Sequence, residues 1–460
     1  MFKLSFYSLI FTIIFSFFTT YAMACSCAMP QTPAKAFEQS KAVFLADVQK
    51  TNTDTKKPKT KIVLNVGKVW KGTPDETFVI DLPRHNCAYW NFEEEQQYLI
   101  YAHSSWDKKR PNSYEVTICS RTKKAKGASL EMQYLDAAMT GKEIEPLNAA
   151  LFTKATDPDA NIRAEAIKLI LEMVGKPETS KEIYATLLKS LSDKEDKVLL
   201  QAIRGFNTYH KTNKNEVITA LIPLLQSENR KIRMATVHVL QNIGKKNRDV
   251  FNALLTTAKT EPDTDKEEHQ YLLSSLVSAV SKTAETAEQK KEAFKMMFST
   301  LDRLDQYALV NVIQHIGFMG KDGASAAPKF IEILKNTEHN HVRQYTILSL
   351  GNIKSAEAVP AITPFIPHKN CYVSASVAEA LYKIDTKESH AALNTQALPH
   401  MTKNFEKCAY EYTNISEQLK GSAKPLLPVL ERHKDNHALQ QYVRDRIKAV
   451  IKNINTDKSQ

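Results

Sequence analysis

Glycine is scarce in this sequence, and the signatures of common catalytic and cofactor sites are missing. Only 12 of the 460 residues are glycine, which leaves little material for the Gly-rich loops that cradle phosphates and dinucleotides. There is no Gly-x-Ser-x-Gly nucleophile motif, no His-Glu-x-x-His zinc motif and no carboxylate pair distinct from the charged faces of helices. The sequence therefore predicts a protein that is not an enzyme and that has no cofactor and no metal of its own.

A long hydrophobic run is present only at the N-terminus. Residues 1–24 combine an early cation, Lys3, with an apolar core and with Ala22 and Ala24 at the −3 and −1 positions. This is the layout of a secretory signal peptide that is cleaved before Cys25. No other run approaches the roughly 20 apolar residues that a membrane-spanning helix needs. We therefore expect no membrane span and an exported protein, periplasmic or extracellular.

Clusters of positive charge are also lacking. The chain has 62 Lys and Arg against 51 Asp and Glu, a formal net charge of +11, and this excess is spread along its length. The tract KTNTDTKKPKTK (residues 50–61) is interpreted as a solvated loop between strands. Because there is neither clustered arginine nor a recognised module, the charge gives poor support for nucleic-acid binding. The sequence favours proteins, and not nucleic acid, as partners.

Cysteines are few, but most lie together. Of the six, Cys25, Cys27, Cys87 and Cys119 fall in the first third of the chain, and an even number in an exported chain predicts a disulfide framework. Four cysteines allow three pairings, and the sequence alone does not choose among them. The remaining two, Cys371 and Cys408, are about one repeat apart. Equivalent points on stacked helices lie about 10 Å apart, beyond the reach of a disulfide, so a Cys371–Cys408 bridge requires offset positions and is left open.

The first part of the chain reads as strands. Residues 59–70 and 77–82 alternate apolar and polar side chains with period two, and residues 96–102 form a short aromatic and β-branched run. All three tryptophans fall in this part, as expected for the core of a small barrel, and residues 129–139 have a helical period. The pattern predicts a small disulfide-linked β-barrel over residues 25–142, with helices packed on it.

The remainder reads as paired amphipathic helices that repeat. Similar helix openings recur at intervals of about 31–36 residues, and a single longer gap holds two degenerate copies near Tyr271 and Tyr307. Such a period predicts an α-solenoid over residues 143–385, followed by degenerate helical repeats and a C-terminal cap over 386–460. The openings are Asn161-Ile162-Arg163, Lys197-Val198, Lys231-Ile232-Arg233, His341-Val342-Arg343 and Tyr372-Val373.

Two families resemble these parts. Asp157-Pro158 in a turn, followed by the apolar-Arg start of the next helix, resembles HEAT repeats. The front part is similar to the N-terminal domain of tissue inhibitors of metalloproteinases (TIMPs), and more closely to the TIMP-like domain of exported bacterial proteins. The residues that carry this second resemblance are CSC (25–27), AFEQSKAVFLADV (36–48), VGKVWKG (66–72), NCAYWNF (86–92) and CSRT (119–122).

The TIMP resemblance implies a fold, two disulfides and an activity. The fold would be an OB-type β-barrel, with Cys25 paired to Cys87 and Cys27 paired to Cys119. The free α-amine and the carbonyl oxygen of Cys25 would chelate the catalytic zinc of a target protease and displace its water, because such a zinc keeps one position open. Ser26 would point into the adjoining substrate pocket, and the bridges would hold this end rigid. The leading prediction is an inhibitor of zinc metalloproteases.

Two alternatives bear on this prediction. The chain could instead be an exported scaffold that binds proteins without inhibiting a protease. Its cysteines would then serve only to cross-link the barrel. Ala22-Met23-Ala24-Cys25 also partly resembles a lipoprotein signal, but Ala22 and Met23 fit that signal poorly. A lipid anchor would consume the amine and the sulfur of Cys25 and so exclude zinc chelation. The target protease and the partner of the solenoid are not identified by the sequence.

Overall fold

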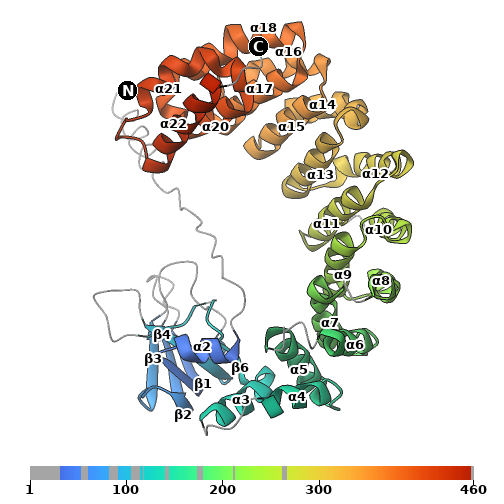
Figure 1. Ribbon diagram of the computed structural model, residues 1–460, viewed down its shortest axis with the longest axis vertical. Coiled ribbons are helices and arrows are strands. Elements are labelled where there is room, and N and C mark those ends of the chain that lie inside the picture. The colour runs from blue at the N-terminus through green and yellow to red at the C-terminus, as the bar shows by residue number, and fades with distance from the viewer. Residues whose placement is uncertain are drawn as a thin grey trace, which may run out of the picture. The chain divides into compact units, whose positions relative to one another are not determined.

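The protein forms two compact units, residues 1–212 and 213–460. The first unit contains a small β-sheet followed by helices, and the second is helical (Figure 1). Every helix within the described ranges is too short or too polar to span a bilayer. The computed structural model describes residues 32–52, 61–81, 92–104, 114–117, 119–139, 145–173, 180–210, 213–261 and 267–456.

One antiparallel sheet is present in the described part of the first unit. Its strands run in the order β3-β2-β1-β4-β5, and β6 also pairs with β4. The ring of Phe78 on β3 packs edge-on against that of Tyr114 on β5, with 4.8 Å between centroids. The two edges therefore approach each other, and the sheet is a nearly closed barrel, as predicted from the alternating segments. The strands are β1 (Ala42–Asn52), β2 (Lys61–Lys71), β3 (Thr77–Asp81), β4 (Gln97–Ser104), β5 (Tyr114–Glu115) and β6 (Lys123–Lys124).

The two faces of the sheet are covered differently. Alternate residues such as Phe44 and Ile100 fill the interior of the barrel, because successive side chains of a strand point to opposite faces. Leu99 and Trp70 lie on the other face, under helices α2 (Pro33–Gln39) and α3 (Ser129–Met139). Trp70 is thus not in the barrel interior, where the sequence placed it. Its indole N–H donates to Oδ1 of Asp136 on α3 at 2.7 Å, a partner that a wholly apolar interior would not supply.

Helix pairs follow the sheet, as predicted, and the predicted repeat openings each lie one residue inside the second helix of a pair. In the first unit these helices are α4 (Glu145–Lys154), α5 (Ala160–Met173), α6 (Ser180–Ser190) and α7 (Asp196–Tyr209). In the second unit the first helices of the pairs, with accompanying short helices, are α8 (Lys214–Leu221), α10 (Arg248–Thr260), α12 (Ala287–Thr300), α14 (Ala327–Asn336), α16 (Val359–Ile362), α18 (Lys387–Ala392), α19 (Leu398–Lys403) and α21 (Leu427–His433). The second helices are α9 (Arg230–Ile243), α11 (Glu267–Thr283), α13 (Gln306–Phe318), α15 (Asn340–Asn352), α17 (Cys371–Ile384), α20 (Ala409–Leu419) and α22 (Gln441–Thr456).

Where a repeat carries the arginine of the signature, as at Arg163 and Arg233, this side chain connects its own turn to the next. The Arg163 guanidinium donates to the carbonyl oxygen of Asp157 in its own turn, at 2.9 Å, and to both carboxylate oxygens of Asp193 in the following turn, at 2.7 and 2.9 Å. Arg233 repeats the arrangement with the carboxylate of Glu261 at 3.1 Å. A planar guanidinium has enough donors for both tasks at once. The apolar-Arg pattern in the sequence is therefore a connection between neighbouring repeats.

Small residues let the second helices stack closely. A Cβ atom added to Gly351 on α15 would lie 2.6 Å from the Cα atom of Ala380 on α17, a distance that real Cβ atoms do not reach. One added to Gly317 on α13 would meet the side chain of Ser349 at 2.5 Å. These glycines therefore set the separation of α13, α15 and α17.

Candidate functional site

The residues predicted to act on a protease zinc are not among those that the structure describes. Cys25, Ser26, Cys27 and Cys87 lie outside the described residues. Cys119 is described and is disulfide-bonded, but its predicted partner, Cys27, lies outside the described ranges. The zinc-directed site and its two pairings therefore stay predictions.

The second predicted cysteine pair lies in the second unit. Cys371 and Cys408 form a disulfide with a Cα–Cα distance of 5.5 Å. Cys371 is the first residue of α17, whereas Cys408 immediately precedes α20. The two cysteines are thus offset by one residue in neighbouring repeats, which is the condition that the sequence set for a bridge.

A buried ionic cluster joins the sheet to the start of the helical repeats. At its centre Glu131 on α3 is fully buried. Its carboxylate accepts hydrogen bonds from the Tyr101 hydroxyl at 2.7 Å, from Arg121 at 2.6 and 2.9 Å, and from the Lys123 ammonium. Arg121 also reaches the carboxylate of Glu172 on α5 at 2.5 Å. We call these five residues the junction cluster.

The charges of the junction cluster keep its central carboxylate ionised. Burial alone would raise the pKa of Glu131, but the Lys123 ammonium and the Arg121 guanidinium outweigh it and lower this pKa to about 2. Burial and the neighbouring Glu131 carboxylate raise the pKa of the Tyr101 hydroxyl, which therefore stays a neutral donor. The junction cluster is therefore a buried ion network that anchors these side chains to one another. The pKa of Glu131 is too low for this carboxylate to act in proton transfer near neutral pH.

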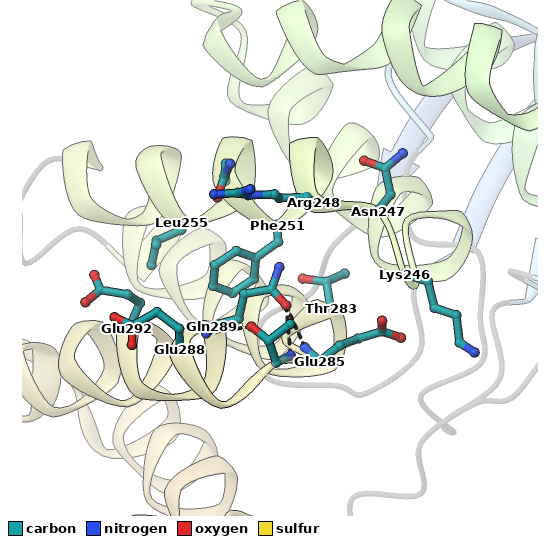
Figure 2. A pocket seen from close by; sticks show the side chains of 12 residues that line it. Lys246, Asn247, Arg248, Phe251, Leu255, Thr283, Glu285, Glu288, Gln289 and Glu292 are labelled. Carbon is teal, nitrogen blue, oxygen red and sulfur yellow. Dashed lines mark hydrogen bonds between the residues drawn. The ribbon is translucent and has the colours of Figure 1, made fainter.

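A pocket of about 670 Å³ lies in the second unit, between the neighbouring helices α10 and α12. Figure 2 shows Phe251 and Leu255 extending from α10 toward α12 to form its floor. Its volume falls within the range of about 300–1,000 Å³ that small ligands or single anchoring side chains occupy. The pocket is lined by Lys246, Asn247, Arg248, Phe251, Asn252, Leu255, Thr283, Glu285, Thr286, Glu288, Gln289 and Glu292.

Charges of opposite sign face each other across this pocket. Lys246 and Arg248 come from the turn before α10 and from its first residue, whereas Glu285, Glu288 and Glu292 come from the N-terminal half of the α12 region. Figure 2 shows Glu288 and Glu292 side by side along α12. The ammonium groups of two neighbouring lysines lower the pKa of Glu292, so this carboxylate is an anion over the whole neutral range. The pocket thus offers an apolar floor between a cationic and an anionic rim.

The hydroxyl groups that line the pocket are hydrogen-bonded within the helices. The Thr283 hydroxyl donates to the carbonyl oxygen of Ala279 at 2.8 Å, and the Thr286 hydroxyl accepts from the backbone N–H of Gln289 at 3.2 Å. Both hydroxyls are therefore engaged in helix ends, and the lining holds neither histidine nor cysteine. In the part of the chain that the structure describes, no group of three or more His, Cys, Asp or Glu side chains is arranged to hold a metal ion.

This pocket was not predicted from the sequence, although one local signal was present. Thr286 and Gln289 have the T-x-x-Q spacing of a capping box, and the structure confirms that both reciprocal bonds are made. The signal places the start of α12, but it does not show that Arg248, some 40 positions earlier in the chain, lies across from it. That proximity arises only when the two repeats stack.

The paired, stacked helices define the class of protein as an α-solenoid. Its repeats are of a known kind: HEAT repeats match residues 184–273 and 327–412, which confirms the resemblance seen in the sequence. The matched residues do not include the front part, so its TIMP resemblance stays a prediction.

Solved structures with a similar arrangement include an engineered protein and importin beta. The engineered protein is 15% identical with a TM-score of 0.44, over 72% of this chain and 94% of that one. A crystal structure of importin beta is 14% identical with a TM-score of 0.49, over 72% of this chain and 49% of that one. The chain thus corresponds to about half the length of importin beta. No curated protein matches it.

Proposed function

We propose that this chain is an exported, non-enzymatic scaffold that binds other proteins through its HEAT repeats. The observation that carries the proposal is the pocket between α10 and α12 in the helical unit. Its α10 side falls within the first segment that matches HEAT repeats, residues 184–273. Solenoids of stacked repeats present long surfaces to partners. An apolar floor with charged rims suits an anchoring side chain of such a partner.

The rims of the pocket define what the partner segment should carry. An apolar side chain would rest on Phe251 and Leu255, with an anionic group toward Arg248 and a cationic group toward Glu288. The opposite rims thereby fix the direction in which a segment lies, because reversing it would place like charges together.

A pair of charge-reversed variants tests this proposal. The immobilised full-length protein is used to capture exported proteins of its source, and captured proteins are identified by mass spectrometry. The variant Arg248→Glu/Glu288→Lys should lose the captured partner. The control Lys321→Glu/Glu338→Lys reverses the same charges at exposed positions away from the pocket and should retain it. Equal capture by both variants, or no specific capture by the wild type, would contradict the proposal.

For the front part we propose the finer activity that the sequence suggests, inhibition of a zinc metalloprotease through the Cys25 amine. The nearly closed antiparallel barrel and the disulfide-bonded state of Cys119 support it. Protein whose N-terminus is verified as Cys25 should inhibit at least one member of a metalloprotease panel. The same chain with one alanine added before Cys25 should lose nearly all potency, because the α-amine is then displaced from the metal. Unchanged potency, or an acylated Cys25, would contradict inhibition through the Cys25 amine. Only the scaffold function would then remain.

A further inference from the structure

Arg343 has the repeat position of Arg163 and Arg233, but the turn after it offers a histidine in place of a carboxylate. Each of these arginines is the fourth residue of its helix, in α15, α5 and α9. Asp193, which accepts from Arg163, lies three residues before the start of α7, and His368 lies three residues before the start of α17. His368 therefore occupies the place where the repeat otherwise supplies an anion.

The other contacts of Arg343 follow the repeat. Its Nη2 group donates to the carbonyl oxygen of Thr337 in its own turn, and its guanidinium lies over the Phe365 ring at 5.3 Å from the centroid. Its Nη1 group faces Nε2 of His368 at 3.4 Å. Among the residues that the structure describes, no carboxylate forms an ion pair with Arg343, not even the exposed Glu338 of its own turn. The arginine is thus held in the orientation of the repeat without the counter-ion of the repeat.

The His368 ring cannot accept from both of its neighbours. The backbone N–H of Asn370 donates to Nδ1 at 3.1 Å. Burial lowers the pKa of His368, and the charges of Arg343 and Lys369 lower it further, so the ring is neutral near pH 7. A neutral imidazole has one acceptor nitrogen and one N–H group, so Nε2 carries the proton. Two donors, Nε2–H of His368 and Nη1–H of Arg343, therefore meet where an acceptor is missing.

A carboxylate is the acceptor that this place fits. It can accept from a guanidinium and an imidazole N–H at once, and such charge-assisted bonds are the strong ones. The same turn holds a carboxylate in other repeats, as Asp193 shows with both oxygens on Arg163 at 2.7 and 2.9 Å. Arg343 and His368 are both partly exposed, so the place can be reached from solvent. The exposed ammonium of Lys369 beside it adds positive charge for an anion.

We propose that Arg343 and His368 bind the carboxylate of an aspartate or glutamate side chain in an acidic segment of a partner protein. The partner thereby supplies the group that Asp193 and Glu261 supply within the chain to the other two arginines. The inference rests on the proposed protein-binding function. It adds a charged contact on α15 and the start of α17, separate from the pocket between α10 and α12.

The variant His368→Asp tests whether the place is built for a carboxylate. It puts an acid where Asp193 lies in the earlier repeat, so the acid should pair with Arg343 and exclude any external carboxylate. Urea unfolding followed by circular dichroism should give a midpoint at least as high as that of the wild type. The control Gln396→Asp adds the same charge at an exposed position in another repeat and should give no such pairing.

Binding is measured by fluorescence anisotropy with the full-length protein and labelled synthetic peptides. The probe is (Ser-Glu)5, compared with (Ser-Gln)5, which has amides in place of the carboxylates. The salt concentration is about 0.15 M, where exposed charges more than about 8 Å apart are largely screened. The wild type should bind (Ser-Glu)5 more tightly, and His368→Asp should weaken that binding at least about tenfold. Gln396→Asp should leave it nearly unchanged.

A second pair of variants removes the cation instead of filling its place. Arg343→Gln should also weaken binding of (Ser-Glu)5 at least about tenfold. The control Lys321→Gln removes one positive charge at an exposed position in another turn and should retain the affinity. Thermal unfolding of each variant verifies the fold, and the stability expected of His368→Asp keeps the test decisive if Arg343→Gln does not fold.

Several outcomes would overturn the assignment. They are equal binding of the two peptides by the wild type, undiminished binding of (Ser-Glu)5 by His368→Asp, and a lower unfolding midpoint for His368→Asp than for its control. Binding of inorganic phosphate that depends on Arg343, without binding of (Ser-Glu)5, would assign the place to a free anion and so also overturn it. Partner capture by the Arg248→Glu/Glu288→Lys variant is measured independently, so the scaffold function would survive failure of the Arg343 contact.

Discussion

The carboxylate of Glu165 on α5 caps the N-terminus of α3, a helix that packs on the sheet. It accepts from the backbone N–H groups of Leu130 and Glu131 at 3.1 and 3.0 Å. These N–H groups belong to the first turn of α3 and have no partner within that helix. An anion at a helix N-terminus also interacts favourably with the helix dipole. A residue of the first repeats thus completes the secondary structure of the front part.

Removing this cap should destabilise the first unit. Glu165→Ala leaves two buried N–H groups unpaired, and we expect a loss of about 2–3 kcal/mol. Tryptophan fluorescence during urea unfolding is a suitable measure, because all three tryptophans lie between residues 70 and 106. Glu182→Ala is the control, since Glu182 is an exposed carboxylate in the first turn of α6. A loss no larger for Glu165→Ala than for the control would refute the capping role.

The first unit should lose stability in acid through Glu131. Its folded-state pKa of about 2 lies below the ordinary value of 4.5. Its contribution is therefore fully present above about pH 4.5 and is lost as the pH falls toward 2, by about 3 kcal/mol in all. Unfolding midpoints of wild type and Glu131→Gln, measured between pH 2 and 6, should converge as the pH falls. The control is Glu93→Gln, because Glu93 forms an exposed ion pair with Lys124. A plot of its unfolding midpoint against pH should run parallel to that of the wild type.

The arginine of the repeat signature should not tolerate lysine. Arg163→Lys keeps the charge but cannot bond Asp157 and both oxygens of Asp193 together, so we expect a loss of about 1.5–3 kcal/mol. The control is Arg204→Lys, because Arg204 is exposed on α7, and a change within about 0.5 kcal/mol is expected there. Urea unfolding followed by circular dichroism at 222 nm measures both. Equal effects would show that charge alone matters at position 163.

A methyl group at Gly351 should force two helices apart. Alanine normally stabilises a helix interior relative to glycine by about 1 kcal/mol, but here it would collide with the backbone of Ala380. We expect Gly351→Ala to destabilise the second unit by about 1–3 kcal/mol. Gly127→Ala has open space around it and should be close to neutral. Circular dichroism during thermal unfolding distinguishes them, and a stabilised Gly351→Ala protein would contradict the close packing.

The disulfide of the second unit should contribute substantially to its stability. It closes a loop with a sequence separation of 37 residues, for which the loop-entropy estimate is about 4 kcal/mol. Replacing both cysteines, Cys371→Ser/Cys408→Ser, leaves the remaining cysteines untouched, which a reducing agent would not. We expect a lower midpoint of urea unfolding for the second unit. A free energy of unfolding within about 0.5 kcal/mol of that of the wild type would show that α17 and α20 are held by packing alone.

Periodic features were predictable from the sequence, and features that join distant segments were not. Period-two alternation predicted strands β2 and β3, and an aromatic and β-branched run predicted β4. The recurring helix openings predicted the second helices from α5 to α17. Both signals are local in the sequence, because the apolar residues on the packed face of one strand or helix recur with a fixed period. The junction cluster is different: Arg121 and Glu172 are far apart in the chain, and neither has a sequence signature that names the other.

Three exposed tyrosines at the starts of second helices lie between these cases. Tyr271, Tyr307 and Tyr372 already stand at the head of their repeats in the sequence, so their alignment was visible. Their exposure was not, because the same position next to Val373 could as well have been part of the core. Only the direction in which each helix packs decides which of two adjacent apolar residues is covered.

The cap on α3 has a practical consequence for dissecting this protein. A fragment ended near residue 142, where the strand-rich pattern stops, would lack both Glu165 and Glu172. It would leave Arg121 with one carboxylate fewer and the first turn of α3 exposed to solvent. A recombinant front part should therefore extend at least through Met173 if it is to fold and be assayed alone. It then includes the carboxylates of Glu165 and Glu172.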